Sequence, residues 1–337
     1  MKKTLVAAAA VLAFAMPLST PAEAIDLPTT NYFQYGDFYS YSLPILAYYY
    51  DQQFGGGTGP GNPYYVTSTP GAIKDLIVIA TGASGGPVNT NFPGMNNAYP
   101  TPNSSGIPTW STENTPNPAN NPIPGYNETW NSTLAAFTLF LDGTNPVFFF
   151  NNNQENSGTA ANQTLWAWGQ VILRDTDTGA PNIYFDFTNN GGAGPIPEGN
   201  AATYNSEGAP NTTALPGAPG SWPDFNDYVL SGGQVTLPIG PGGTNVTFNH
   251  NLGANQAAYA IISPELNAFL AAWQLGSFSA YDAISIDLRF LGLNNGYEQV
   301  FLARSDFIPP VPEPSTIVLL GAGLLGLGYC ARRRSKK

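Results

Sequence analysis

Cysteine is almost absent from this chain of 337 residues, and its single copy, Cys330, lies close to the C-terminus. Disulfide bonds and thiolate metal sites therefore cannot stabilise the residues before it. A hydrophobic core has to do so, and a chain of this length is large enough to build one.

Basic residues are also scarce, and most of them lie at the two ends of the chain. Within residues 25–311 the only bases are Lys74, Arg174, Arg289 and Arg304, which face 20 acids and leave a formal charge of −16. A segment this acidic repels phosphate backbones and anionic lipid surfaces. We therefore expect no nucleic-acid partner, and we expect cations such as Ca²⁺ rather than anions as ligands.

The N-terminal residues divide into three parts. Two lysines precede an apolar run over residues 5–18, and a short polar stretch closes on an A-x-A ending formed by Ala22 and Ala24. This order is typical of a secretory signal peptide. A transmembrane anchor is the alternative, but about fourteen apolar residues are too few to cross roughly 30 Å of hydrocarbon. We predict that residues 1–24 are removed after export by the general secretion machinery, which makes Ile25 the mature N-terminus.

The C-terminal residues also contain three parts in a fixed order. The motif Pro312-Glu313-Pro314 comes first, an uncharged apolar run over residues 316–329 follows, and a basic cluster ends the chain. Proline cannot continue a helix interior, so we predict a single transmembrane helix that begins after the motif. The cluster should stay in the cytoplasm, which places the preceding domain, residues 25–310, outside the membrane. The cluster consists of Arg332, Arg333, Arg334, Lys336 and Lys337.

This arrangement of residues 311–337 resembles the PEP-CTERM sorting signal of Gram-negative bacteria. In that family the signal is read by exosortase, an integral-membrane cysteine transpeptidase. The resemblance implies that Pro312, Glu313 and Pro314 are the recognition motif, and that the helix and the arginines are removed after transient anchoring in the inner membrane. It also implies delivery to the surface or the extracellular (biofilm) matrix of a cell that makes extracellular polysaccharide. An ordinary single-span anchor is the alternative.

The composition of the remaining chain predicts a mainly β fold. Aromatic residues make up 13%, charged residues only 10%, and there are 37 glycines and 31 prolines, which indicate many turns. Residues 284–290 alternate between apolar and polar side chains, which is typical of a half-buried strand. We therefore expect Ile286 to face the core and Asp287 to lie on the opposite, solvent-facing side, where Asp287→Asn should be nearly silent. We predict one antiparallel β-sandwich, jelly-roll-like, with two long Gly/Pro/Asn-rich loops over residues 82–127 and 189–226. Further predicted strands cover residues 64–67, 75–80, 147–150, 165–173, 183–187, 227–230, 234–237, 246–248, 257–262 and 297–303.

One short helix is predicted in this domain. Ser263 is a suitable N-cap, Pro264 suits the first helical position, and Glu265 places an acid in the first turn. Apolar residues then follow at helical spacing, and Gly276 is suited to end the helix. We expect a helix over residues 264–274 that packs on a sheet.

An acidic hairpin is the best metal candidate. Asp175 and Asp177 precede a glycine, and Asp186 occupies the twelfth position counted from Asp175, which loosely resembles a calcium loop. The pattern departs from such loops at its fifth and sixth positions, where glycine and alanine stand. A plain hairpin turn explains the same residues. Apart from this weak Ca²⁺ candidate we expect no cofactor.

No catalytic constellation is evident. Ser84 lies in a G-x-S-x-G match, but the residues after it cannot form the helix that a nucleophile elbow needs, and the only available base would be His250. Asp224 with Asp227 or Glu298 could supply paired carboxylates for glycoside hydrolysis, which spacing alone cannot test. We therefore expect a non-catalytic structural role. The alternative is a carbohydrate-binding module or a glycoside-active enzyme that acts on extracellular polysaccharide, with aromatics of residues 32–50 stacking on sugar rings.

Two other segments resemble parts of other exosortase-sorted proteins. They are residues 81–85, Thr-Gly-Ala-Ser-Gly, and residues 293–299, Leu-Asn-Asn-Gly-Tyr-Glu-Gln. The resemblance implies no activity for either segment.

Overall fold

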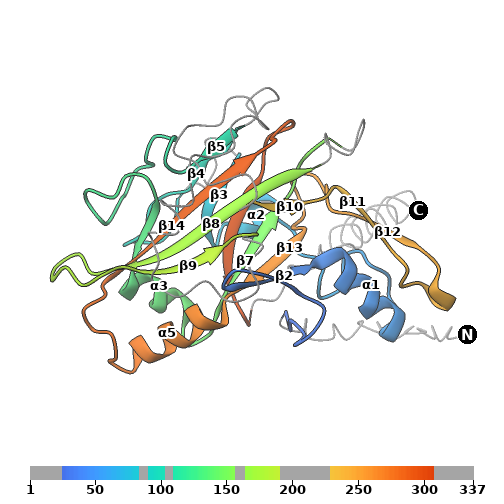
Figure 1. Ribbon diagram of the computed structural model, residues 1–337, viewed down its shortest axis with the longest axis horizontal. Helices are drawn as coiled ribbons and strands as arrows, with labels where there is room; N and C mark the ends of the chain where they lie inside the picture. Colours follow the sequence, from blue (N-terminus) through green and yellow to red (C-terminus); the bar gives the residue numbers. More distant parts are fainter. Residues whose placement is uncertain (1–24, 83–89, 103–108, 156–163, 190–227, 307–337) are drawn as a thin grey trace, which may run out of the picture.

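The computed structural model describes residues 25–82, 90–102, 109–155, 164–189 and 228–306 (Figure 1). The signal peptide and the sorting signal lie outside these ranges, and so do Ser84, Asp224 and Asp227. Within the described ranges, no helix is both long and apolar enough to cross a membrane.

The fold is mainly β, and its sheets are antiparallel apart from one parallel pair, β3 with β4. The first sheet has the strand order β1 (Phe33–Tyr35), β2 (Phe38–Ser42), β13 (Tyr259–Ile262), β7 (Pro146–Asn151), β15 (Gln299–Arg304), β3 (Ile77–Thr81) and β4 (Tyr99–Pro100). The second contains β10 (Val229–Ser231), β8 (Leu165–Arg174), β14 (Ala283–Leu291) and β5 (Thr109–Ser111) in one row, with β6 (Trp130–Thr133) paired to β14 and β9 (Ile183–Phe187) paired to β8. A separate hairpin joins β11 (Gln234–Leu237) and β12 (Val246–Asn249).

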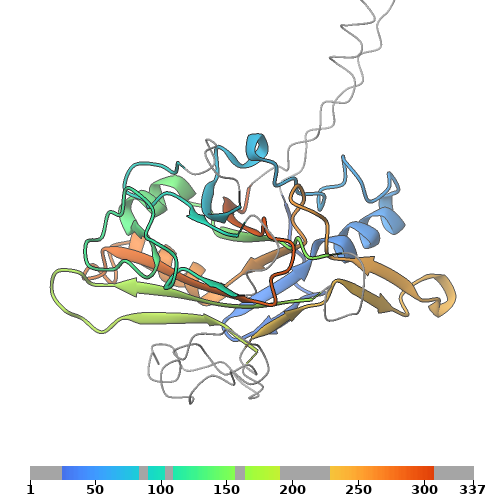
Figure 2. The same cartoon turned by 90° about the horizontal axis from the view of Figure 1, so that it is seen from above.

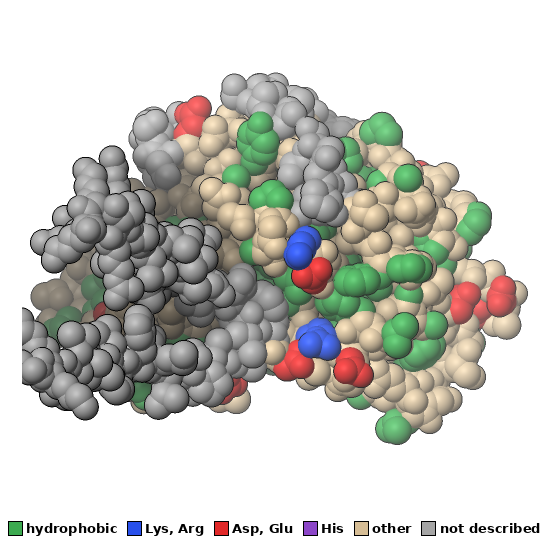
Figure 3. Space-filling model, turned by 180° about the vertical axis from the view of Figure 1, so that it is seen from behind, with side chains coloured by type: hydrophobic (Ala, Val, Ile, Leu, Met, Phe, Trp, Pro, Cys, Tyr) green, Lys and Arg blue, Asp and Glu red, His purple; other side chains and the backbone are tan. Residues whose placement is uncertain are grey.

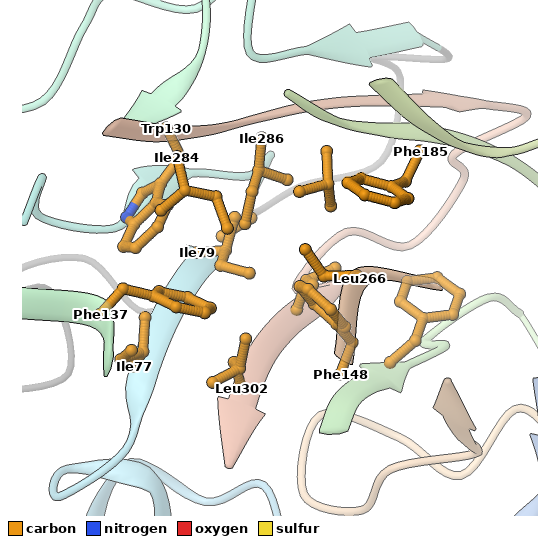
Figure 4. Close-up of a cluster of buried hydrophobic side chains, with 14 of the residues drawn as sticks. Ile77, Ile79, Trp130, Phe137, Phe148, Phe185, Leu266, Ile284, Ile286 and Leu302 are labelled. Carbon is orange, nitrogen blue, oxygen red and sulfur yellow. The ribbon is translucent and has the colours of Figure 1, made fainter. Parts of the chain in front are cut away.

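The two sheets lie in two layers and share one hydrophobic cluster (Figure 2). Side chains of the layers point toward each other, with Ile286 and Phe185 from the second sheet and Phe148 and Leu302 from the first (Figure 4). The predicted alternation of β14 is confirmed, because Ile286 is buried in this cluster. A second cluster covers the outer face of the first sheet, and Ile25 is part of it at 3% exposure.

The described residues form more helices than the single one that the sequence predicted. The predicted helix is present as α5 (Pro264–Gln274), and the hydroxyl of Ser263 accepts a hydrogen bond from the backbone N–H of Leu266 at 3.1 Å. Three more are α1 (Leu43–Phe54), α2 (Pro70–Ile73) and α3 (Leu134–Leu141). The caps of α1 and α3 follow the same chemistry, since Ser42 and Thr133 each accept from the backbone N–H three residues on. The tyrosine run inside α1 has strand propensity, and tertiary packing overrides it.

The segment 82–127, predicted as a loop, contains β4 and β5 and holds an ordered network of asparagines. Asn96 Oδ1 accepts a hydrogen bond from the backbone N–H of Asn131 at 2.8 Å. The side-chain amide of Asn91 donates to the backbone carbonyl of Val78 at 2.7 Å and accepts from its backbone N–H at 2.8 Å. Amide side chains therefore supply hydrogen bonds that strands supply elsewhere. Conversely, residues 64–67, predicted as a strand, form only an isolated bridge between Thr67 and Gln256.

The outer face of β14 is buried, contrary to the expectation for Asp287. This residue is 5% exposed and Arg289 is 4% exposed, and residues 112 and 113, which directly follow β5, bond them on this face. Arg289 bonds Asp287 at 2.8 Å and Glu113 at 2.9 Å, and the hydroxyl of Thr112 donates to Asp287 at 2.9 Å. The strand is therefore packed on both faces, with an ion-pair cluster on the second.

Two of the four bases of the domain are thus removed from its surface. Arg289 is paired as described, and Arg174 is 8% exposed, donates to Ser285 at 2.8 Å and lies over the ring of Tyr126. Lys74 and the half-buried Arg304 remain, each beside acids. The face in Figure 3 accordingly carries few charged side chains, with hydrophobic ones in separate small groups.

Candidate functional site

A pocket of about 280 Å³ lies between the two sheets, where the β11–β12 hairpin meets them. Phe150 from the first sheet, Phe290 from the second and Leu237 from the hairpin all line it. Figure 1 places the neighbouring elements β10, β11 and β13 at this end of the sheets. The described lining is mostly aromatic and aliphatic and contains no Asp, Glu, Lys or Arg. Concave, largely apolar sites with few polar groups are the usual form of small-molecule pockets.

Two polar residues of the lining, Ser42 and His250, are hydrogen-bonded to each other. Ser42 ends β2 and caps α1, and His250 directly follows β12. The Ser42 Oγ and the His250 Nε2 lie 2.8 Å apart. Sequence reasoning singled out His250 but not its partner, because 208 residues separate the two and no local pattern connects them.

His250 is deeply buried at 2% exposure, and its ring stacks on that of Tyr259 with centroids 5.1 Å apart. Burial lowers the pKa of His250 to about 4, so the imidazole is neutral at pH 7. Its second nitrogen, Nδ1, is buried and finds no hydrogen-bond partner among the described residues. A neutral imidazole has one donor and one acceptor nitrogen, so whichever tautomer is present, one hydrogen-bonding capacity remains unused.

Tyr259 is itself fixed by a chain of hydrogen bonds. The hydroxyl of Ser231 donates to the Tyr259 hydroxyl at 3.0 Å, and the side-chain amide of Asn152 donates to Ser231 at 2.7 Å. Burial raises the pKa of Tyr259 well above its usual range. The polar edge of the pocket is therefore held in one geometry by residues of both sheets.

Among the residues that the structure describes, the Ser42–His250 pair has no third member of a hydrolytic triad. Catalytic serines need a histidine whose other nitrogen is held by an orienting group, usually a carboxylate. Among the described residues no group bonds the Nδ1 of His250.

The three aspartates of the calcium hypothesis are not brought together. Asp175 Oδ1 accepts from the backbone N–H groups of Asp177 and Thr178, at 3.0 and 2.7 Å, and its Oδ2 accepts from that of Ala180 at 2.8 Å and from the Thr178 hydroxyl. These bonds hold the pKa of Asp175 well below its usual range. Asp186 lies further along β9, opposite Gln170, from whose amide it accepts at 2.6 Å. Asp177 is exposed, and the described residues contain no group of three candidate metal ligands.

Of the carboxylates considered for glycoside hydrolysis, only Glu298 lies within the described residues. It is fully buried at 0% exposure and does not line the pocket. One carboxylate oxygen accepts from Gln154 at 2.9 Å, and the other has no hydrogen-bond partner among the described residues. Burial raises the pKa of Glu298 to about 8, so it is largely protonated at pH 7.

Thr81 and Gly82, the described residues of the first segment that resembles other exosortase-sorted proteins, lie against the second such segment, residues 293–299. An added Cβ on Gly82 would approach the Cα of Tyr297 to 2.5 Å, which only glycine permits. The amide of Gln299 donates to the hydroxyl of Thr81 at 3.2 Å.

Comparison with known families adds two results. A family model described as a domain of unknown function (DUF8239) matches residues 21–289, and the chain belongs to that family. A model of the PEP-CTERM protein-sorting motif matches residues 310–334. The recognition of the sorting signal from sequence is thereby confirmed. The motif identifies an exported protein that is anchored transiently in the membrane and then processed by exosortase.

A comparison with curated proteins and one with solved structures gave no match. The family match ends at Arg289, inside β14, whereas β15 lies between β7 and β3 in the first sheet. The folded unit therefore extends beyond the matched residues, at least to Arg304.

Proposed function

We propose that the protein is a non-catalytic component of the cell surface or extracellular matrix of a Gram-negative bacterium. The observation that carries this proposal is the sorting signal at residues 310–334, which directly follows a β domain whose last described strand ends at Arg304. A folded domain between two removable ends is suited to release into the extracellular space. No described residue bonds the Nδ1 of His250 as a third group of the Ser42–His250 pair would, which favours a binding or structural role over a hydrolytic one.

We also assign the domain to the antiparallel β-sandwiches of the jelly-roll-like kind. The cluster shared by the two sheets supports this assignment, since facing sheets with interdigitated side chains define such folds. In the first sheet, β2 neighbours β13 and β15 neighbours β3, so most neighbours are distant in sequence. Greek-key connections produce that order.

The burial of Ile25 supports the proposed boundaries. Its side chain is 3% exposed, and the hydroxyls of Tyr64 and Tyr41 donate to the carbonyls of Asp26 and Pro28 at 2.8 and 2.9 Å. The residues directly after the predicted cleavage site at Ala24 are thus packed in the fold.

Mass spectrometry of the native protein tests the sorting proposal. We expect an N-terminus at Ile25 and loss of the residues after Pro314. A variant with alanine at Pro312, Glu313 and Pro314 should keep its C-terminal tail, and export with removal of residues 1–24 should be unchanged. Recovery of an intact 332–337 tail from the mature wild-type protein would contradict the proposal.

A carbohydrate-binding role is the second candidate, favoured by exposed aromatic rings on α1. Phe54 is 65% exposed and Tyr49 is 38% exposed, and the rings of Tyr50 and Phe54 lie 4.8 Å apart. An oligosaccharide array with a turnover assay would separate the candidates. Binding that Phe54→Ala abolishes, without turnover, would favour a module for extracellular polysaccharide. Turnover would favour a glycoside-active enzyme, and neither result would leave the structural role.

A further inference from the structure

We propose that the pocket between the sheets binds a neutral, ring-bearing apolar molecule that carries one hydroxyl group, and that this hydroxyl bonds His250. The inference goes beyond the sorting and surface role of the protein and does not depend on it.

The size and the lining of the pocket define the apolar part of the ligand. Its volume is about 280 Å³, nearly twice that of apolar cavities of about 150 Å³, which stay dry and bind benzene. The rings of Phe150 and Phe290, from opposite sheets, lie 5.4 Å apart, and Phe38 lines the same space. Aromatic walls of this kind favour flat rings. A fused bicyclic molecule is of suitable size.

The charge of the lining excludes ionic ligands. No acidic or basic side chain is among the described lining residues, and His250 is neutral because burial lowers its pKa to about 4. A carboxylate or an ammonium group would be buried here without a counter-charge, which costs several kcal/mol. The ligand is therefore neutral.

The unused nitrogen of His250 defines the polar group of the ligand. A buried donor or acceptor without a partner is costly, so a ligand that supplies the missing partner gains affinity. If Nδ1 carries a proton it needs an acceptor, and if it does not it needs a donor. A hydroxyl group can act as either, whereas a carbonyl can act only as an acceptor.

The imidazole is already held in place before a ligand arrives. Ser42 fixes its Nε2 at 2.8 Å, and Tyr259 stacks on its face with an interplanar angle of 7°. Preorganisation of this kind reduces the entropy cost of binding.

The test uses two probes of nearly equal shape, 2-naphthol and 2-methylnaphthalene. The first carries a hydroxyl group where the second carries a methyl group. Each probe is titrated against the exported, processed protein loaded with the fluorescent dye N-phenyl-1-naphthylamine. We expect both probes to displace the dye and 2-naphthol to bind about threefold to tenfold more tightly, as one neutral hydrogen bond predicts. His250→Phe keeps a stacking ring without nitrogens and should abolish the difference while 2-methylnaphthalene still binds.

Two further variants locate the binding site. Val235→Trp, on the hairpin that lines the pocket, should weaken both probes at least tenfold, with circular dichroism as the check of folding. Leu139→Ser removes an apolar side chain that is 82% exposed on α3, away from the pocket, and should change nothing.

Several results would overturn the proposal. One is that neither probe displaces the dye in a saturable way, and another is that the two probes bind with equal affinity. A third is that the preference for 2-naphthol survives His250→Phe, and a fourth is that Val235→Trp leaves the binding of both probes unchanged.

Discussion

The hydroxyl oxygen of Ser42 lies 2.8 Å from Nε2 of His250, and this contact joins the start of α1 to the end of β12 across 208 residues. Both residues line a largely apolar pocket. Because burial holds the imidazole in its neutral form, the stability of the fold depends on pH.

The first prediction concerns His250 in acid. Its pKa is about 4 in the folded protein and near 6.5 in the unfolded chain. Between these values the unfolded chain binds the proton and the folded one does not, so the free energy of unfolding falls as the pH falls from 6.5 to 4. The contribution is on the order of 3 kcal/mol. Urea denaturation at a series of pH values measures it.

His250→Phe is the matched variant for this prediction. It should be less stable than the wild type at pH 7, because Ser42 loses its partner, but it should lose less stability between pH 6.5 and 4. A wild-type slope that His250→Phe leaves unaltered would assign the acid sensitivity to other groups.

The second prediction concerns Glu298 and has the opposite sign. Burial raises its pKa to about 8, whereas the unfolded value is near 4.5. Above pH 4.5 the unfolded chain has lost the proton that the folded one keeps, so this contribution to stability is full at low pH and is lost as the pH rises toward 8. The loss is on the order of 5 kcal/mol.

Glu298→Gln imitates the protonated side chain and keeps an oxygen for the hydrogen bond from Gln154. We expect this variant to unfold at a higher temperature than the wild type at pH 8 and to have the same stability near pH 4.5. If it is destabilised equally at both pH values, the carboxyl group is not the source of the pH dependence.

The third prediction compares neighbouring residues of β14. Ile286→Asp places an unpaired charge in the core shared by the two sheets and should cost about 4 kcal/mol or more. Asp287→Asn weakens the bonds to Arg289 and Thr112, but Arg289 keeps Glu113, so a cost of about 1–3 kcal/mol is expected. Chemical denaturation measures both. Asp287→Ser, which leaves more of Arg289 unpaired, should cost more than Asp287→Asn, and a silent Asp287→Asn would contradict the assignment.

The revised cost of Asp287→Asn shows where sequence reasoning stops. Alternation identifies which residues of β14 share a face, and Ile286 lies in the core as predicted. It does not tell whether the other face is also covered, since Thr112, which bonds Asp287 there, directly follows β5 and lies 175 positions away. A polar residue on a buried face is found only once its partners are known.

The helices illustrate the same limit at shorter range. Ser263-Pro264 indicated α5, and Ser42-Leu43-Pro44 offered a similar start for α1. The tyrosines that follow Pro44 favour a strand by propensity, and α1 forms because its buried residues, Leu43 among them, pack in the second cluster. The pocket could not be predicted at all, because its lining extends from Phe33 to Val300.

The last prediction concerns cations. Residues 25–311 have a formal charge of −16, and Arg174 and Arg289 are buried, so mutual repulsion of surface acids opposes folding. We expect the melting temperature to rise modestly with NaCl, because salt screens this repulsion. Ca²⁺ at constant ionic strength should add nothing, because both oxygens of Asp175 already accept hydrogen bonds within the hairpin.

Two variants of the hairpin separate the turn from a calcium site. Asp175→Ala removes the acceptor of four hydrogen bonds and should lower the melting temperature equally with and without Ca²⁺. Asp177→Asn changes an exposed side chain whose carboxylate would matter only to a bound cation, so it should be silent in both conditions. A rise with millimolar Ca²⁺ that Asp177→Asn removes would instead establish the hairpin as a calcium site. A rise that survives Asp177→Asn would place the cation elsewhere in this acidic domain.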